Sequence, residues 1–556
     1  MTAPPTQLDD ATPLRPLAEV WSIAWPTVLT MTSYPIMQFV DKLMVGQVGP
    51  LEVAAQGNGG IWSFTPIAFA FGVLTVVNTF VSQNLGAGRA KEGPKYAWAA
   101  IWLSVLAWLF VLLPWAAMLE HVFTFIHRPQ VDRLLASLST LPADAAATVR
   151  AELDDLDRLV TLETEYGRIL LVGALVLMMG KGIHHYFFGL HRPKVVTLSA
   201  LCGNLTNVLL NYTLIFGADG LVIPTASGGL TLPGVPGVPA LGLRGAAIGT
   251  VIGTLVEVAI PLAIFLGPRM NASLASRSVW KPRLGPMRDL IRIGWPAAVQ
   301  FGNEIVCWSI FMSVLVGLFG TNHQTAGWIV LSYMHLSFMP AVGFSVAVTS
   351  LVGKYIGAGE PDTAVNRARL GLAISVVYMT ICGAALYFFR EPMVRWFIGG
   401  GEVTAAETEA IVVIGAKLMI CAAIFQTVDA FGIVYTGALR GAGDTVWPGV
   451  VTIIYSWSLI VGGGWAMTVL WPQLESVGPW IGASVYIVLF GVTMAWRFES
   501  GRWRSIRLLG DIEADAARRM PPAPALPASE ADAVARDIAP ELGEAAVERE
   551  DDPAAR

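Results

Sequence analysis

The sequence has few charged residues for its length. They make up 14% of the 556 residues, whereas a soluble domain carries about a quarter. In their place, hydrophobic residues make up 54%, and apolar runs of about 20 residues, the length that crosses a bilayer core, recur from end to end. This balance excludes a soluble globular protein and predicts an all-α membrane protein with many spans.

Cysteines and catalytic motifs are also scarce. No metal-binding cluster, nucleophile elbow or phosphate-binding loop falls on the apolar runs. The cysteines lack the spacing of a zinc site, and we interpret all four as small core residues rather than disulfides: Cys202, Cys307, Cys382 and Cys421. We therefore expect neither an enzyme nor a cofactor, and no nucleic-acid partner.

The apolar runs predict twelve spans, the first too long for a cleavable signal peptide. They lie at roughly 17–45, 54–83, 96–119, 167–190, 194–217, 242–268, 287–317, 325–355, 368–389, 410–438, 446–471 and 478–498. Basic residues gather in the loops after the even-numbered spans, from Arg89 after the second to Arg440 after the tenth. The positive-inside rule then places both termini in the cytoplasm, and we expect the plasma membrane, as the inner membrane of a bacterium.

Three polar segments interrupt or follow this plan. Residues 120–166 form an insert on the outer side, where apolar residues recur at helical spacing and predict a short amphipathic helix or hairpin. Residues 218–241 are rich in Gly and Pro and predict an irregular outer loop. From about residue 511, within a cytoplasmic tail at 499–556, an Ala-, Pro- and acid-rich composition predicts disorder. The apolar positions of the insert are Val149, Leu153, Leu156 and Val160.

The two halves of the chain repeat one another. At an offset of 271 residues, GQVG at 46–49 matches GLFG at 317–320, Gly72 matches Gly343, and GAG at 86–88 matches GAG at 357–359. Six spans is an even number, so both halves insert with the same orientation, and an axis along the membrane normal would relate them around a central cavity. We expect an N-terminus at 1–16, two six-helix lobes at 17–268 and 287–498, and a cytoplasmic linker at 269–286.

Several motifs in the repeat resemble a known family. In the second half they are P-x7-E (Pro296 and Glu304), MPAVGFSVAVTSLVGKYIGAG and DAFGIVYTGALRGAGDT; in the first they are VDKLMVGQVG, VSQNLGAG and GLRGAAIGT. Taken together, over residues 17–498, they resemble the multidrug and toxic compound extrusion (MATE) family. The resemblance implies twelve helices in two lobes and export of organic, mostly cationic, compounds in exchange for H+ or Na+. The insert and the acidic tail depart from the family pattern.

Glu304 is the leading candidate for ion coupling. It lies in the apolar stretch VQFGNEIVCWSIF, in the middle of its predicted span, where a charge costs about 2.5–3.5 kcal/mol unless it faces a cavity or a partner. A carboxylate that holds either a proton or a cation, but not both, meets the minimum requirement for antiport. The alternative is a protonated Glu hydrogen-bonded between helices. Pro26 in AWP lies at an offset of 270 residues from Pro296 in GWP, and at this offset the counterpart of Glu304 in the first half is Tyr34. We therefore expect this carboxylate in one lobe only, with Tyr34 as a candidate cavity residue.

Asp429, in the tenth span, is the second candidate. The resemblance assigns Glu304 and Asp429 to an ion site in the carboxyl-terminal lobe, where Na+ could bind. If both carboxylates face one cavity, their repulsion would ease proton uptake by one of them. The alternative for Asp429 is a packing hydrogen bond near the inner end of its span.

Polar residues of the first half suggest a second site. The resemblance places Asp41 at the cavity of the amino-terminal lobe. Asn207 and Asn211 share one face of the fifth span at i and i+4, so they could supply amide oxygens, and Thr250 on the sixth span could join them. The alternative is ordinary hydrogen bonding between helices, worth about 1 kcal/mol per bond.

Lys181 is an unexpected cation in the middle of the fourth span. It could pair with Asp41, bind a substrate anion, or extend its ammonium group to the interface. If it lines the cavity, the pocket is not purely cation-selective. His184 and His185 point to different sides of the helix, so they make a poor metal pair.

The sequence therefore favours a monomeric ion-coupled exporter in the lipid bilayer that moves small organic cations, with Glu304 and Asp429 handling H+ or Na+. The alternative is a flippase or exporter of an anionic or lipid-linked metabolite, which a strongly cationic cavity would favour. A passive channel fits poorly, because the duplicated halves and single carboxylates suggest a closed site rather than a ring of charges.

Overall fold

Long apolar helices account for nearly all of the regular structure. The computed structural model describes residues 15–138, 142–225, 228–398 and 405–509. Ten helices in these ranges are long and apolar enough to cross a membrane. Two more, α1 (Pro16–Gly46) and α7 (Pro193–Phe216), have the length of a span but are not among those ten. Both helices contain polar residues of the predicted sites. Together with the ten apolar helices, they correspond to the twelve predicted spans.

The described residues of the first half form eight α-helices besides the strands given below, and two of its spans change geometry along their length. The second span is α2 followed by α3, separated at Val76, and the third passes through a π-helical turn at Trp108–Leu112 into α5. Besides α1 and α7, the helices are α2 (Pro50–Thr75), α3 (Val77–Gly86), α4 (Gly93–Ala107), α5 (Leu113–Leu138), α6 (Ala143–Gly189) and α8 (Leu243–Phe265), with a 3-10 turn at Ala90–Glu92.

The predicted linker contains α9 (Pro268–Leu274), and the second half follows with two more π-helical segments, at Phe311–Val316 and Ser456–Gly463. Its helices are α10 (Leu284–Ile310), α11 (Thr321–Gly357), α12 (Pro361–Phe388), α13 (Arg390–Ile398), α14 (Ala405–Ala442), α15 (Val446–Tyr455), α16 (Gly464–Leu470) and α17 (Val477–Glu499), with 3-10 turns at Gly317–Phe319, Pro472–Leu474 and Arg502–Ser505.

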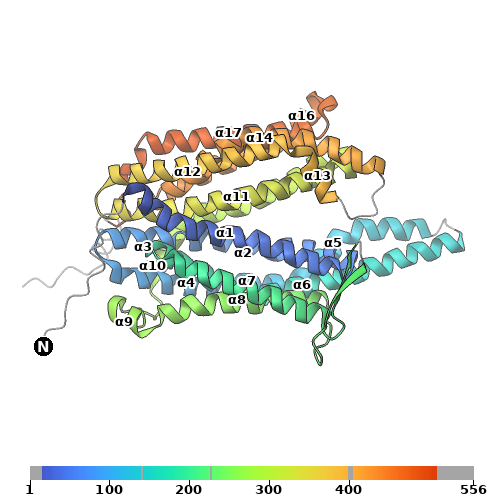
Figure 1. Cartoon of the computed structure of the whole chain (residues 1–556), viewed down its shortest axis with the longest axis horizontal. Coiled ribbons are helices and arrows are strands. Elements are labelled where there is room, and N and C mark those ends of the chain that lie inside the picture. The colour runs from blue at the N-terminus through green and yellow to red at the C-terminus, as the bar shows by residue number, and fades with distance from the viewer. Residues whose placement is uncertain (1–14, 139–141, 226–227, 399–404, 510–556) are drawn as a thin grey trace, which may run out of the picture. The chain divides into compact units, whose positions relative to one another are not determined.

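The insert forms a helical hairpin. Its helices are continuations of α5 and α6, which extend past the neighbouring helices in Figure 1. The predicted apolar stripe is real, since Leu156 is 8% exposed and Val149, Leu153 and Val160 are half-buried. The hairpin was therefore predicted correctly, but it is an extension of two spans rather than a short separate element.

The Gly- and Pro-rich loop is more ordered than the sequence suggested. Strands β1 (Leu221–Thr225) and β2 (Gly228–Leu232) pair antiparallel, with Leu221 opposite Leu232 and Thr225 opposite Gly228. The prediction of an irregular loop was wrong for these two segments, which pair as short strands despite the Gly and Pro around them. The predicted disordered segment from about 511 lies outside the described residues.

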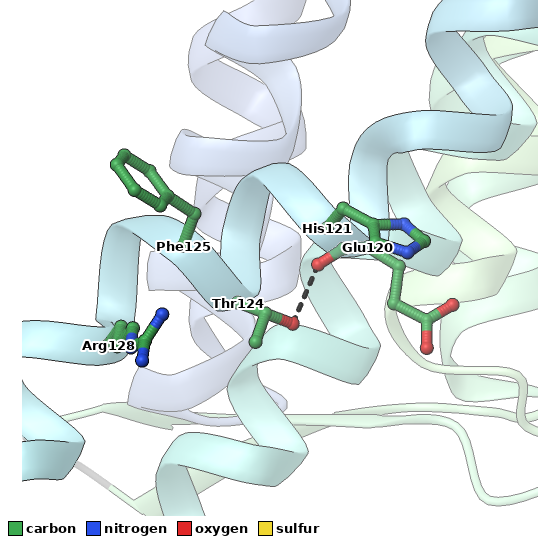
Figure 2. A pocket seen from close by; sticks show the side chains of 5 residues that line it. All are labelled: Glu120, His121, Thr124, Phe125 and Arg128. Atoms are coloured by element: carbon green, nitrogen blue, oxygen red, sulfur yellow. Dashed lines mark hydrogen bonds between the residues drawn. The ribbon is translucent and has the colours of Figure 1, made fainter.

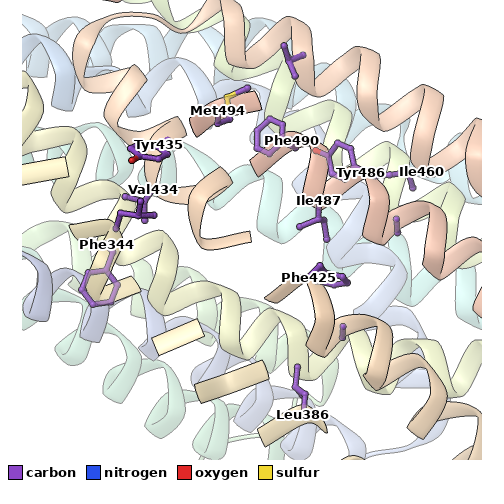
Figure 3. Packing of buried hydrophobic residues seen from close by; sticks show 14 of the residues in the cluster. Phe344, Leu386, Phe425, Val434, Tyr435, Ile460, Tyr486, Ile487, Phe490 and Met494 are labelled. Atoms are coloured by element: carbon purple, nitrogen blue, oxygen red, sulfur yellow. The ribbon is translucent and has the colours of Figure 1, made fainter. Parts of the chain in front are cut away.

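The hydrophobic core of the second half joins α11, α12, α14 and α17. Figure 3 shows aromatic and aliphatic side chains meeting there, among them Phe344 of α11, Phe425 of α14 and Ile487 of α17. Phe425 is fully buried. The close packing of these large side chains fixes the helices of the second half relative to one another. The polar residues of α10 are therefore held in defined positions.

The repeat reappears as two equivalent helix crossings between the halves. Gly72 of α2 lies against the backbone of Ala298 in α10, and a Cβ on Gly72 would come within 2.2 Å of the Ala298 nitrogen. The matching Gly343 of α11 lies against Val28 of α1, where a Cβ would come within 2.6 Å of Cα. Glycine is needed at both crossings because only a hydrogen atom fits between the helices.

The same reciprocity occurs near the ends of α3 and α11. Gly86 packs on the carbonyl of Lys354, and Gly357 packs on the carbonyl of Gln83, so both glycines and both carbonyls match at the offset of 271 residues. Residues through Ile506 form a single contact unit, so the predicted boundaries of two lobes stay a prediction.

Candidate functional site

The polar residues predicted in the first half lie together. The amide of Asn211 donates to a carboxylate oxygen of Asp41 at 2.7 Å and to Asn207 Oδ1 at 3.3 Å. The amide of Asn207 in turn donates to the Thr250 hydroxyl at 3.2 Å. Asp41 is 6% exposed and Asn211 is fully buried. Three helices, α1, α7 and α8, thus contribute to one hydrogen-bonded group, which we name the Asp41 cluster.

The spacing of small residues on α8 makes room for the Asp41 cluster. A Cβ on Gly249 would lie 2.1 Å from Asn211 Oδ1, and a Cβ on Gly253 would lie 2.7 Å from the Cβ of Asn207. Glycine recurs after four residues on α8, and asparagine recurs after four residues on the facing α7. The side-chain ridges of the two helices therefore interlock. Asn211 Oδ1 is buried and has no hydrogen-bond partner among the described residues, so one amide oxygen beside Asp41 is left unsatisfied.

A second carboxylate of the first half is Glu257, one further step along the same ridge of α8. The Tyr34 hydroxyl donates to Glu257 Oε1 at 2.5 Å, and His184 Nδ1 lies 3.7 Å from the same oxygen. Glu257 is 8% exposed. Lys181 interacts electrostatically with Glu257 rather than with Asp41, whose carboxylate is bonded to Asn211. We name Tyr34, His184 and Glu257 the Glu257 cluster.

The structure thus adds a carboxylate of the first half that the sequence analysis did not single out. Tyr34 matches Glu304 in the repeat, but Glu257 brings an acidic group to Tyr34 from another helix. The sequence signal was present, because Glu257 is a lone carboxylate in the apolar run GTLVEVAIPL. Its partner, however, lies 223 residues away, and no local spacing reveals that contact.

In the second half, the structure brings Glu304 and Asp429 close enough to interact electrostatically. Gln300, one turn earlier on α10, donates to Glu304 Oε1 at 3.5 Å, a long and weak hydrogen bond. Asp429 of α14 has no hydrogen-bond or ion-pair partner in the part of the chain that the structure describes. Tyr486 of α17, labelled in Figure 3, interacts electrostatically with both carboxylates.

A polar network beside Glu304 fixes this face of α10. The amide of Asn303 donates to the Ser456 hydroxyl at 2.8 Å, and the indole of Trp457 donates to Asn303 Oδ1 at 2.8 Å. Cys307 Sγ contacts the same oxygen at 3.8 Å. Ser456 opens the π-helical segment between α15 and α16, so the irregular turn presents two side chains to Asn303.

Arg440 was predicted in a cytoplasmic loop, but it lies inside α14, which continues to Ala442. Its guanidinium lies over the ring of Phe301, 5.8 Å from the centroid, and interacts electrostatically with Glu304. Its carbonyl accepts a hydrogen bond from Thr79 of the first half at 2.9 Å. The prediction was wrong because α14 continues to Ala442, past the predicted end of the span at 438.

Contacts between the halves gather where α3, α6, α11 and α14 meet. The amide of Asn78 donates to the carbonyl of Val346 at 3.2 Å, and that of Gln83 donates to the carbonyl of Gly441 at 2.9 Å. The Ser350 hydroxyl donates to the carbonyl of Phe188 at 2.6 Å. These bonds hold the halves together at one end of the helices.

An ion-paired group tightens the same end. Glu19 of α1 accepts hydrogen bonds from the Tyr355 hydroxyl at 2.7 Å and from Arg367 Nε at 2.7 Å, and Lys354 Nζ lies 3.3 Å away. Glu19 belongs to the first half and its three partners to the second. We name these four residues the Glu19 cluster.

Other features of the described chain lie apart from these groups. Within the described residues, no group of three or more His, Cys, Asp or Glu side chains is placed to hold a metal ion, and all four cysteines are free. Figure 2 shows a hollow lined by five residues of α5 alone, Glu120, His121, Thr124, Phe125 and Arg128. Its single dashed bond joins the Thr124 hydroxyl to the carbonyl of Glu120, so the hollow is a surface feature of the insert.

Comparison with known proteins agrees with this architecture. A family model described as MatE matches residues 26–140 and 296–463, which together are just over half of the chain. The two segments begin at Pro26 and Pro296, the matching prolines of the repeat. The chain therefore belongs to the MatE family of membrane transporters.

Relatives match along most of their length. The multidrug resistance protein NorM of Burkholderia vietnamiensis is 27% identical over 477 residues, which cover 86% of this chain and 92% of that protein. The probable multidrug resistance protein NorM of Burkholderia pseudomallei is 28% identical over 497 residues, covering 89% and 94%.

Solved structures share the fold. A crystal structure of MATE in complex with MaL6 superposes with a TM-score of 0.71 at 17% identity, covering 88% of this chain and 98% of that one. A MOP superfamily transporter from Pyrococcus furiosus, described as having a binding pocket of reverse polarity, superposes with a TM-score of 0.70 at 17% identity, covering 88% and 97%. At this identity the likeness shows the fold alone.

Proposed function

We propose that this protein exports organic, mostly cationic, compounds in exchange for H+ or Na+ by alternating access. NorM relatives that match over nine-tenths of their length are described as multidrug resistance proteins, which supports a broad substrate range. The distribution of basic loops supports a cytoplasmic location of both termini, and the bacterial relatives support the inner membrane of a bacterium.

The observation that carries the proposal is the pair Glu304 and Asp429. A carboxylate within a span is costly unless it is protonated, paired with a cation or open to water. Glu304 has one long hydrogen bond and Asp429 has none within the described residues, and both are half-buried. Since neither is neutralised by a salt bridge, each is available to a coupling ion or to a cationic substrate.

Mutual exclusion provides the coupling. When a proton or Na+ occupies the Glu304 site, a cationic substrate meets a less negative pocket and leaves. When the ion departs, the free carboxylates attract the next cation. Two like charges close together favour uptake of one proton, so the pair reloads readily. The flow of the ion down its gradient then drives the substrate up its own gradient.

Alternating access needs contacts that form and break between the halves. The Glu19 cluster and the adjoining backbone contacts close the end that carries the basic loops, which we assign to the cytoplasmic side. The Asp41 cluster, with an unsatisfied acceptor at Asn211, would bind an ion or a substrate group in the amino-terminal half. The protein is expected to work as a monomer, because each chain contains both halves.

Ethidium efflux from whole cells tests the proposal, with the proton and sodium gradients collapsed separately. We expect efflux to stop when one of the two gradients is removed, which also identifies the ion. Efflux that continues undiminished after both collapses would rule out antiport. Cells that express an empty vector provide the background rate.

A further inference from the structure

The segment between α9 and α10 is held in place along its length. The indole of Trp98 on α4 donates to the carbonyl of Ser276 at 2.7 Å, and the Ser276 hydroxyl donates to the carbonyl of Phe265 at 2.6 Å. One turn further along α4, the indole of Trp102 donates to the carbonyl of Trp280 at 2.8 Å. The linker backbone is therefore fixed along α4, and α10 starts from a defined position.

Four cations on this segment and on the start of α10 have no counter-charge. All four are exposed, and within the described residues none of their head groups donates a hydrogen bond or lies within 4.0 Å of a carboxylate. These unpaired cations are Lys281, Arg283, Arg288 and Arg292. By contrast, the exposed Arg369 on the side that we assign to the cytoplasm pairs with Glu499, and Arg504 on that side pairs with Asp362. The four unpaired charges are therefore available to an anionic ligand.

Helical spacing places two of these cations on one exposed face of α10 together with apolar side chains. Arg288 and Arg292 lie one turn apart, and Leu284 precedes Arg288 by the same interval. On the same face, Ile291 and Trp295 are each 49% exposed, and Leu284 is 84% exposed. A face that joins exposed apolar and basic residues at the end of a span is typical of a helix at the lipid–water interface.

The order of these side chains follows the layers of a membrane surface. The cations lie toward the end of α10 that we assign to the cytoplasmic side, and Trp295 lies one turn deeper. Indole rings favour the headgroup region, whereas Lys and Arg extend to the phosphates. A cluster of about four or more basic residues beside a span favours anionic lipids, because a neutral lipid leaves the positive charge uncompensated.

We propose that the linker and the first turns of α10 form an interfacial patch that binds the headgroup of an anionic phospholipid. Guanidinium groups hold a lipid phosphate through two parallel hydrogen bonds, and the exposed apolar residues contact the acyl chains. The bound lipid lies beside both the linker between the halves and the helix that carries Glu304. This inference does not depend on which compound is exported. The patch consists of Trp280, Lys281, Arg283, Arg288, Arg292 and Trp295.

Lipid binding to the purified full chain tests the patch. The protein in a non-ionic detergent is titrated with phosphatidylglycerol or with phosphatidylcholine of the same acyl chains, and native mass spectrometry records the bound lipid. We expect wild type to prefer phosphatidylglycerol by about tenfold or more. In the double variant Arg288→Gln and Arg292→Gln, the affinity for phosphatidylglycerol should fall by about tenfold or more, because two charge contacts with the lipid are lost.

Hydrogen exchange locates the bound lipid. In nanodiscs, replacement of half of the phosphatidylcholine by phosphatidylglycerol should slow amide exchange severalfold in wild-type peptides that cover 277–292. The same replacement should leave these peptides unchanged in the double variant Arg288→Gln and Arg292→Gln. Slower exchange that is confined to other peptides would place the anionic lipid elsewhere and contradict the patch.

The chain offers two matched controls. The double variant Arg369→Gln and Arg504→Gln removes the same number of exposed cations from existing ion pairs, so binding of phosphatidylglycerol should stay at the wild-type value. The double variant Arg288→Lys and Arg292→Lys keeps the positive charge of the patch and should keep most of the affinity. All four positions are exposed, so none of these substitutions disturbs the core.

The remaining outcomes decide the ligand. Equal binding of both lipids by wild type, an unchanged affinity in Arg288→Gln and Arg292→Gln, or the same loss in the ion-pair control would each overturn the patch. Glycerol phosphate has the phosphate group but no acyl chains, so it should not displace phosphatidylglycerol at equal concentration. If it does displace the lipid, the cations bind a soluble phosphate and the assignment to a phospholipid is wrong.

Discussion

The two halves of the molecule share a backbone plan but treat their carboxylates differently. In the first half, Asp41 accepts from Asn211 and Glu257 accepts from Tyr34, both through short hydrogen bonds. In the second half, Glu304 has only a 3.5 Å bond from Gln300, and Asp429 is unbonded within the described residues. Duplication thus preserves the scaffold, whereas the polar side chains determine which half can exchange an ion easily.

The matched crossings explain why the scaffold is preserved. Gly72 and Gly343 each admit the backbone of a helix from the opposite half, and neither contact tolerates a larger residue. Side chains that line the space between the halves face no such restriction. The positions of Tyr34 and Glu304 are therefore free to differ, although the helices that carry them are equivalent.

The largest effect is expected for Glu304→Gln. An amide has nearly the same shape but cannot exchange a proton or attract a cation, so coupled efflux should fall to background while the protein still inserts in the membrane. Efflux and the amount of membrane-embedded protein are measured in the same cells. Tyr34→Phe, the matching position of the first half, should retain most of its efflux; equal loss in both variants would remove the difference between the halves.

Alanine at the two crossing glycines should destabilise the protein by similar amounts. Gly72→Ala and Gly343→Ala each place a methyl group against backbone, which costs about 1–3 kcal/mol of unfolding free energy. Thermal unfolding in detergent measures the change. Gly57→Ala is the control, because no atom lies within 4 Å of the added Cβ. A clear loss in only one of the crossing variants would mean that the repeat is not reciprocal.

Loss of the Tyr34 hydroxyl should destabilise the first half moderately. A hydrogen bond to a charged acceptor contributes about 1.5–3 kcal/mol, so Tyr34→Phe should lower the unfolding temperature. In Glu257→Gln the hydroxyl still finds an acceptor, and the loss should be smaller. If Tyr34→Phe unfolds at the wild-type temperature, Glu257 is not held by this bond.

The smallest effect is expected at the Glu19 cluster. Glu19→Gln weakens three contacts between the halves and should raise hydrogen exchange severalfold in peptides that cover 78–86 and 346–357. Mass spectrometry of the detergent-solubilised protein measures this exchange. Glu409→Gln is the control, because it breaks an exposed ion pair with Arg395 inside the second half. Equal exchange in both variants would show that the Glu19 cluster does not hold the halves together.

Much of the fold could be predicted from the sequence, because apolar length and glycine register are local signals. The apolar runs located the spans, and the spacing of Asn207 and Asn211 predicted that they share one helix face, on which the Asn211 amide donates to Asp41. The interactions between polar and charged side chains on different helices could not be predicted in this way. Tyr34 bonds to Glu257, and Arg440 interacts electrostatically with Glu304, across distant segments, and these interactions depend on how the helices cross.

Ion displacement by substrate tests the central claim most directly. Purified protein in detergent, with its Glu304 site loaded in turn by H+ or Na+, is mixed with a cationic substrate while ion release is recorded. If the ion and the substrate exclude one another, binding releases one of these ions from wild type and none from Glu304→Gln. Binding of the substrate without release of either ion would contradict the account.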